Sequence, residues 1–177
     1  VLHRFNAVFV DWESQLAMPG RWLLAGEAEV FFDDTEIEVE GHKFEGARIN
    51  YEGNRALGWQ TLWYGPWLLD GILDGAGDVS EHLPVLLAEH QHRWAGRASY
   101  FYADSGSSAG KYLNRIAGAD FTRWSISYNK WTDKLDRLAA ELPERLWSVL
   151  PPADQPQEQY TWVKHQPGEC QRVQKFA

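Results

Sequence analysis

The sequence predicts one α/β domain built on a mixed sheet, in which antiparallel strands come first and parallel strands follow. Three observations lead to this fold class. The chain has 177 residues, 44% of them hydrophobic, which suffices for one domain with a sizeable core. Its first half holds successive runs of period two, separated by short turns. Its second half alternates helical and strand-like patterns, as expected for parallel strands joined by helices.

The N-terminal region has no clean pattern apart from a short helix predicted between Phe5 and Leu16. Pro19 and Gly20 then interrupt the chain. Residues 1–28 are therefore expected to be a helical remnant outside the main domain.

The antiparallel part of the sheet is predicted from four strand-like runs. They cover residues 29–40, 46–51, 58–64 and 67–73, and Gly, Pro and Asp cluster at the turns between them. Short connections of this kind favour an antiparallel meander.

The helical part begins where the period changes. One helical face is formed by Leu83, Leu86, Leu87, His90 and Trp94. Ser80 is a candidate N-cap for this helix. A short buried strand at 99–103 ends at Asp104, a turn and a helix lead to Gly118, and residues 121–128 are predicted to form the next strand. Thr132 is expected to cap a last helix that carries Leu135, Leu138, Ala139 and Leu142.

The C-terminal region starts with a polar, proline-bearing linker, PPADQPQEQ, at residues 151–159. Residues 160–164 and 172–176 have the composition of strands that find no partner before the chain ends. We therefore expect the fold to be truncated here.

Charge and cysteine content narrow the function classes. The formal net charge of −8 argues against a sequence-independent grip on nucleic acid, although it leaves room for a local basic groove. The single Cys170 excludes an internal disulfide and fits a reducing, cytoplasmic compartment. No apolar run reaches the roughly 18 to 20 residues of a membrane span, so no membrane partner is expected. The ten tryptophans are interpreted mainly as core and interface residues.

Two aspartates stand out as candidate functional residues. Alternation along the first strand places Asp33 on one face with Phe31, Thr35 and Ile37, which predicts a carboxylate directed toward the interior. Asp34 lies on the opposite, mostly acidic face. Asp104 ends an apolar strand, where open α/β sheets keep functional groups. If the two strands are neighbours, their acids would repel unless one is protonated or divalent cations lie between them. Oxygen-only ligation suits Mg²⁺ or Mn²⁺.

The same residues carry a resemblance to the DDE-class transposases of bacterial insertion sequences, which have a ribonuclease-H-like core. The run VFFDDTEIEVEGHKFEGARINYEGNRALGWQTLW resembles the first-aspartate block of that family, and YFYADSGSSAGKYLNRIAGADFTRWSIS resembles the second. WTDKLDRLAAELPERLW is similar to the segment that follows. The resemblance implies a partial ribonuclease-H-like catalytic core at residues 29–150 and the start of a β-rich insertion at 151–177.

The resemblance also implies an activity, namely metal-dependent cleavage and strand transfer of DNA at the ends of a mobile element. Asp33 and Asp104 would be catalytic and would bind two Mg²⁺ or Mn²⁺ ions, with Asp34 as a second choice for the first ligand. Thr35 would support the first acid by a hydrogen bond. The implied partners are DNA and, in the transposition complex, a second copy of the chain.

The third acid of the family, a Glu that follows a Tyr-x-x-Arg motif, is not found. The motif spans Tyr112 to Arg115 here, and the position four residues further on is Ala119. The chain alone is therefore expected to be inactive or nearly so. Candidate DNA-contacting cations are Lys111, Arg115, Arg123, Lys130 and Lys134.

Three alternatives remain open. A ribonuclease-H-like nuclease would use the same two aspartates for hydrolysis alone. A non-catalytic module would use its tryptophans to bind a polysaccharide or a protein. A histidine metal site at His90 and His92 is the weakest, because residues two apart do not share a helical face.

Overall fold

The computed structural model describes residues 27–41, 43–75, 80–128, 133–149, 159–160, 163–166, 168–171 and 174–176. The predicted N-terminal helix, Lys130, Thr132 and residues 151–158 of the predicted linker lie outside these ranges. No helix in the described ranges is long and apolar enough to cross a membrane.

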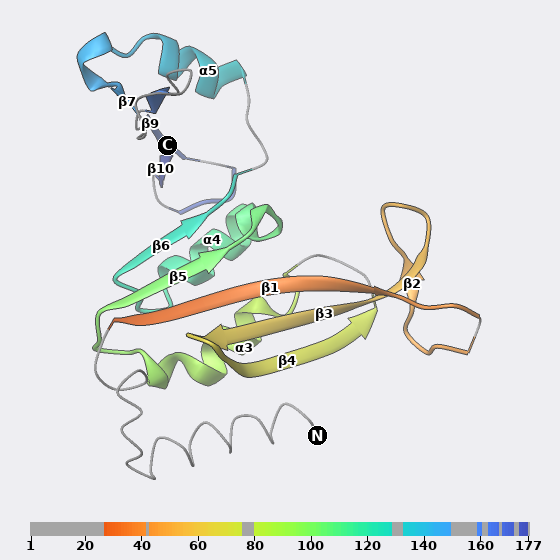
Figure 1. Ribbon diagram of the computed structural model, residues 1–177. Helices are drawn as coiled ribbons and strands as arrows, with labels where there is room; N and C mark the ends of the chain where they lie inside the picture. The colour runs from red at the N-terminus through yellow and green to blue at the C-terminus, as the bar shows by residue number, and fades with distance from the viewer. Residues whose placement is uncertain are drawn as a thin grey trace.

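A six-stranded mixed sheet forms the centre of the fold (Figure 1). Its long strands are β1 (Ala28–Glu38), β3 (Arg55–Tyr64) and β4 (Trp67–Gly75), which pair antiparallel in the order β1-β3-β4. On the other side of β1, β5 (Ser99–Ala103) and then β6 (Arg123–Ile126) pair in parallel. The short β2 (Arg48–Ile49) pairs with the start of β3, next to the end of β4. The predicted meander followed by parallel strands is confirmed, and the arrangement is compatible with a ribonuclease-H-like fold.

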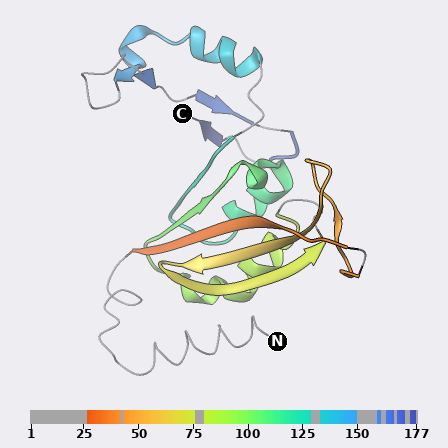
Figure 2. The same ribbon diagram turned by 45° about the vertical axis from the view of Figure 1, so that its right-hand side comes forward.

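Two helices cover one face of this sheet, α3 (Leu83–His90) and α4 (Gly110–Ala117) (Figure 2). A turn of 3-10 helix, η1 (Gln91–Arg93), extends α3, and another, η2 (Ser105–Ser108), precedes α4. Proline in the first turn of α3 suits a helix start, since the N–H groups there have no partner within the helix. On α4, Tyr112, Leu113 and Ile116 are buried while Lys111 and Arg115 are exposed, as expected for an amphipathic helix.

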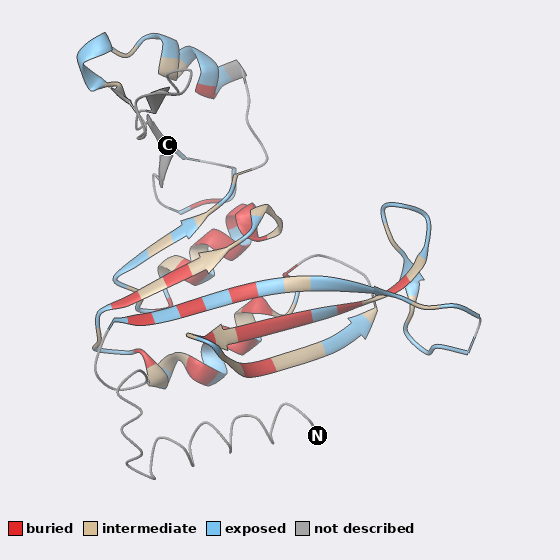
Figure 3. Cartoon of the chain, in the orientation of Figure 1, coloured by how far each residue is buried: buried red, intermediate tan, exposed pale blue. Residues whose placement is uncertain are grey.

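The core lies between the covered face of the sheet and these helices. Burial alternates along the first half of β1, where Ala28, Val30 and Phe32 are buried and the residues between them are exposed (Figure 3). Trp94 and Phe101 are fully buried at the centre. The Trp94 indole packs on Phe121 and donates a hydrogen bond to the Ala119 carbonyl at 2.8 Å, which satisfies its one polar atom.

The C-terminal part comprises α5 (Asp133–Ala140), η3 (Glu144–Leu146) and four short strands, β7 (Ser148–Val149), β8 (Gln159–Tyr160), β9 (Val163–His165) and β10 (Gln174–Phe176). They pair as two small antiparallel ribbons, β7 with β8 and β9 with β10. The two C-terminal runs, which were predicted to lack partners, are therefore paired: β9 pairs with β10, and β8 pairs with β7.

The turn at residues 168–171 connects this part to α4. The Asn114 side chain donates to the Glu169 carbonyl and accepts from the Gln171 N–H, each at 2.8 Å. Cys170 is buried in this contact, and Gly110 leaves room for it, since a Cβ at Gly110 would collide with the Gly168 carbonyl oxygen. The buried Cys170 thiol has the surroundings of a structural rather than a reactive cysteine.

Ser80 does not cap α3 as the sequence suggested. The residue before the helix is His82, which makes no side-chain cap, and Ser80 has a left-handed backbone with φ of 71°. Its hydroxyl contacts Ser107 instead, because the chain approaches α3 across the carboxyl end of β5.

Candidate active site

Asp33 and Asp104 occupy equivalent positions just beyond the paired part of two neighbouring strands. The parallel pairing of β1 with β5 ends at Phe32 and Ala103, so each aspartate is the next residue in its chain segment. Neighbouring strands lie about 4.8 Å apart. The two acid-bearing strands are thus neighbours, which was the condition for expecting their acids to repel or to share a cation, although the two residues are 71 positions apart in the chain.

Asp33 does not point into the core. Its side chain is exposed, on the face of the sheet that α3 and α4 leave uncovered, together with Phe31 and Thr35. The predicted face was wrong because Phe31, which suggested an interior face, remains 36% exposed and stacks on Tyr102 of the next strand, at 5.1 Å between ring centroids, instead of packing under a helix. The expected support from Thr35 is present as a hydrogen bond of 2.9 Å from its hydroxyl to Asp33 Oδ2.

Asp34 is the acid on the covered face, in line with Val30 and Phe32. It is half-buried. Its Oδ1 is buried and has no hydrogen-bond partner within the described residues. Burial raises the pKa of Asp34, the nearby Ser80 N–H opposes this increase, and the charges of Glu36, Asp33 and Asp104 add to it.

Asp104 is exposed at the carboxyl end of β5 and caps the turn that follows. Its Oδ1 accepts a hydrogen bond of 3.0 Å from the Gly106 N–H, so the N-cap role expected for a strand-end aspartate is present. One carboxylate oxygen suffices for this bond. A cap of this kind orients the carboxylate and is compatible with a second role as a ligand.

Asp33 and Asp104 are the two acids that suit a hard divalent cation, because both are exposed and both follow the last paired residues of neighbouring strands. Carboxylate oxygens are the ligands that Mg²⁺ and Mn²⁺ prefer. Asp34 lies on the opposite face of β1, and within the described residues no group of three possible ligands that includes Asp33 or Asp104 has its atoms within 4.8 Å of one another. The implied metal therefore fits Asp33 and Asp104, and Asp34 does not join them.

The predicted DNA-contacting cations within the described ranges are all exposed, but they lie on different elements. Lys111 and Arg115 are on α4, Arg123 is on β6 and Lys134 is on α5. The Lys111 Nζ lies 4.7 Å from the ring centroid of Tyr112. These side chains are exposed to solvent, as charged side chains usually are. Their positions do not define one basic surface, and no contact assigns any of them to DNA.

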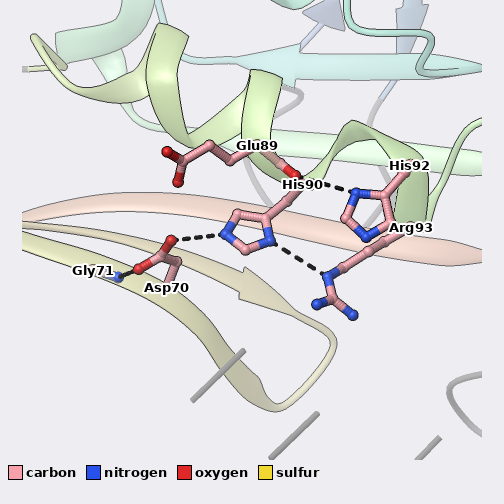
Figure 4. Close-up of polar contacts among 6 residues, drawn as sticks. All are labelled: Asp70, Gly71, Glu89, His90, His92 and Arg93. Atoms are coloured by element: carbon pink, nitrogen blue, oxygen red, sulfur yellow. Dashed lines mark hydrogen bonds and ion pairs between the residues drawn. The ribbon is translucent and has the colours of Figure 1, made fainter. Parts of the chain in front are cut away.

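A second polar cluster, which the sequence did not predict, joins β4 to α3 (Figure 4). The His90 Nε2 lies 2.7 Å from Asp70 Oδ2, and both residues are buried. The Arg93 Nε donates to His90 Nδ1 at 3.3 Å, and the Gly71 N–H donates to Asp70 Oδ1 at 2.7 Å. With Nδ1 acting as acceptor from Arg93, Nε2–H is the donor to Asp70.

Glu89 completes a triad of possible metal ligands with Asp70 and His90, all within 4.8 Å of one another. Both ring nitrogens of His90 are already used, and Arg93 approaches the same ring. A cation on Nε2 would displace the bond to Asp70 and add positive charge beside a guanidinium. The cluster therefore serves as a polar connection between sheet and helix. His92, in contrast, is exposed and bonds only to the Glu89 carbonyl among the contacts described.

A tryptophan-lined binding face receives little support from the described residues. Trp94 is fully buried, and of the other described tryptophans only Trp59, 37% exposed, is more than partly accessible. The Trp59 indole lies over Gly71, where a Cβ would come within 2.8 Å of its Nε1. These rings mostly pack against the sheet, as the composition suggested.

Comparison with known proteins gives one distant structural likeness. No family model matches the sequence, and no curated protein matches it. A cryo-EM structure of the piggyBac transposase synaptic complex with hairpin DNA is similar, with a TM-score of 0.46 and 9% identity over 82% of this chain. The chain spans about a third of that protein, 32%. The likeness is to a transposase rather than to an insertion-sequence family, and it is too distant to carry a functional conclusion.

Proposed function

We propose that this chain provides part of the catalytic core of a DNA transposase of the DDE class, as in bacterial insertion sequences, with a ribonuclease-H-like fold. The observation that carries the proposal is the placement of Asp33 and Asp104 directly after the last paired residues of two parallel neighbouring strands. The resemblance of the two sequence blocks around these acids adds to it. DNA is the expected substrate, and a second copy of the chain is the expected partner.

The proposed ligands of Mg²⁺ or Mn²⁺ are Asp33 and Asp104. Bound there, the metal would supply Lewis acidity for phosphoryl transfer. The chain's own contribution is orientation. The Thr35 hydroxyl donates to Asp33 and the Gly106 N–H donates to Asp104, so each carboxylate is directed by a group on its own strand or turn. Because both acids are exposed, a DNA backbone can reach them without rearrangement of the core.

Asp34 has a different role in this proposal. Its carboxylate lies on the covered face near the Ser80 N–H, which favours a role in placing the chain that enters α3 over a role as a direct ligand. The third acid of the class would come from outside the two blocks.

The proposal is tested by titrating the chain with Mn²⁺ and following the free ion by electron paramagnetic resonance (EPR). Asp33→Asn and Asp104→Asn keep the shape of each side chain and remove its charge. Each is expected to weaken Mn²⁺ affinity at least about a hundredfold, the upper end of the loss caused by removing a supporting residue. Glu29→Gln is the matched control, because Glu29 is exposed on the same strand and the same face, four residues before Asp33.

The outcome separates the proposal from its alternatives. Mn²⁺ affinity that is unchanged in both aspartate variants would place any metal elsewhere and refute the assignment. No Mn²⁺ binding by the parent chain would favour a non-catalytic module. If Asp34→Asn, rather than Asp33→Asn, abolished binding, the first ligand would be Asp34.

A further inference from the structure

Ser80 has an unusual backbone conformation at a fully buried position. Its φ is 71°, and its exposed fraction is 0%. A residue other than glycine seldom adopts this region, and it does so where its surroundings hold it there. Its carbonyl accepts the Leu83 N–H at 3.1 Å, so Ser80 shapes the turn that starts α3.

The segment at Ser80 is held by side chains of two adjacent strands. The Ser80 N–H lies near the Asp34 carboxylate on β1 and counteracts the rise in its pKa that burial causes. Gln60, which faces Asp34 across the β1–β3 pair, accepts the His82 N–H at 2.8 Å. These contacts lie on the covered face, behind the residues proposed to bind metal.

The Ser80 side chain reaches the other half of the candidate site. Its Oγ lies 2.8 Å from the Oγ of Ser107, which is also fully buried. Ser107 belongs to η2, the turn that Asp104 caps, and its N–H bonds to the Asp104 carbonyl at 3.3 Å. The segment at Ser80 thus lies next to Asp34, is hydrogen-bonded to Gln60 through His82, and is hydrogen-bonded through Ser107 to the turn that carries Asp104.

Strand pairing between β1 and β5 does not reach the two aspartates. The last paired residues of β1 and β5 are Phe32 and Ala103, so the ladder ends just before both acids. Beyond that point, the hydrogen bond between the Ser80 and Ser107 hydroxyls directly connects the segment before α3 with η2, the turn that follows β5. Asp33 follows the movement of β1 because it is the neighbour of Asp34.

We propose that Ser80 and Ser107 are positioning residues of the candidate metal site, and that their hydroxyl pair sets the separation of Asp33 and Asp104. The inference rests on the proposed function, since it assigns these serines a role toward the same metal. Neither serine contacts the metal in this proposal.

The experiment measures Mn²⁺ affinity and the EPR spectrum of bound Mn²⁺ for the parent chain and four variants. Ser107→Ala removes one hydroxyl. Ser80→Gly removes the other while keeping the N–H to Asp34 and the left-handed backbone, which glycine adopts without strain. The double variant combines them.

Ser99→Ala is the matched control. Ser99 is a fully buried serine at the other end of β5, where its hydroxyl accepts the Thr122 N–H at 3.4 Å. Loss of its hydroxyl tests what a general weakening of the same strand does to the metal site. Melting temperatures of all variants are compared alongside the Mn²⁺ affinities.

We expect Ser107→Ala and Ser80→Gly each to weaken Mn²⁺ affinity about tenfold, the lower end of the effect of supporting residues on metal sites. The double variant should be no weaker than either single variant, because both remove the same bond. The EPR spectrum of bound Mn²⁺ should change in these variants, since it reports ligand geometry. Ser99→Ala should leave both quantities unchanged even where it lowers the melting temperature.

Three results would count against the inference, and they differ in what they leave standing. Parent binding that Asp33→Asn abolishes, but that both serine variants leave unchanged, would refute the positioning role and leave the proposed function intact. A parent chain that binds no Mn²⁺ would refute the proposed function and the positioning role with it. Additive losses in the double variant would also count against one shared bond.

Discussion

Replacing His90 with leucine is expected to destabilise the fold strongly, although His90 lies outside the candidate site. The reason is Asp70, which is 2% exposed and directs one carboxylate oxygen at the His90 ring at 2.7 Å. The other oxygen bonds to the Gly71 N–H. Leucine would fill much of the space of the ring but leave a buried carboxylate without the donor that faces it.

The expected loss of stability follows from the cost of leaving one member of a buried polar pair without its partner. Removing a partner from such a pair costs about 3 to 5 kcal/mol. For a chain of this size that corresponds to a decrease in melting temperature on the order of 6 to 20 °C. His92→Leu is the control, because His92 is exposed two residues away and its change should stay within about 0.5 kcal/mol.

Urea unfolding followed by tryptophan fluorescence measures both variants. The double variant Asp70→Leu with His90→Leu completes the argument, because it removes the buried carboxylate together with its donor. It should lose less stability than the two single losses added together. A His90→Leu variant as stable as His92→Leu would refute the reasoning, and so would full additivity in the double variant.

Two further changes test the surroundings of the candidate site. Burial raises the pKa of Asp34 above its ordinary value of 3.8, so its ionised form destabilises the fold at neutral pH. Asp34→Asn should therefore melt at a higher temperature than the parent at pH 7, and the difference should shrink as the pH falls and disappear only below pH 3.8. A pH-independent difference in melting temperature would contradict the burial argument. In Gly110→Ala, the new methyl group would collide with the Gly168 carbonyl and displace the turn that holds Cys170. The rate of thiol labelling at Cys170 should then increase at least about tenfold. Gly118→Ala, at the other end of α4, is the control and should leave this labelling rate unchanged.

The order of elements could be predicted from local pattern. The strand at β1, the strands at β3 and β4, and the helix and strand alternation from residue 83 onward all follow from periodicity and turn residues. Asp104 at the end of β5 was predictable for the same reason, because an apolar strand stops at a polar turn. These features depend on neighbours within a few residues, and the sequence displays those directly.

The face of β1 that is buried was decided by tertiary structure. Alternation separates Asp33 from Asp34 but does not say which face meets the helices. The apolar Phe31 and Ile37 suggested that the face of Asp33 is inside, whereas α3 and α4, which come at least 45 residues later, cover the face of Asp34. Ile37 is 40% exposed where β1 extends beyond the helices.

The polar contacts between distant elements could not be predicted from the sequence either. Asp70 faces His90 because a bulge between Leu62 and Trp63 shifts the register of β4, and the His90 partner lies 20 residues away. Ser80 meets Ser107 across 27 residues, through a backbone conformation that no local preference of serine predicts. Sequence by itself determined which segments are strands and helices and where the acids stand on them. Only packing decided which side chains face each other, since that depends on register and on elements distant in the chain.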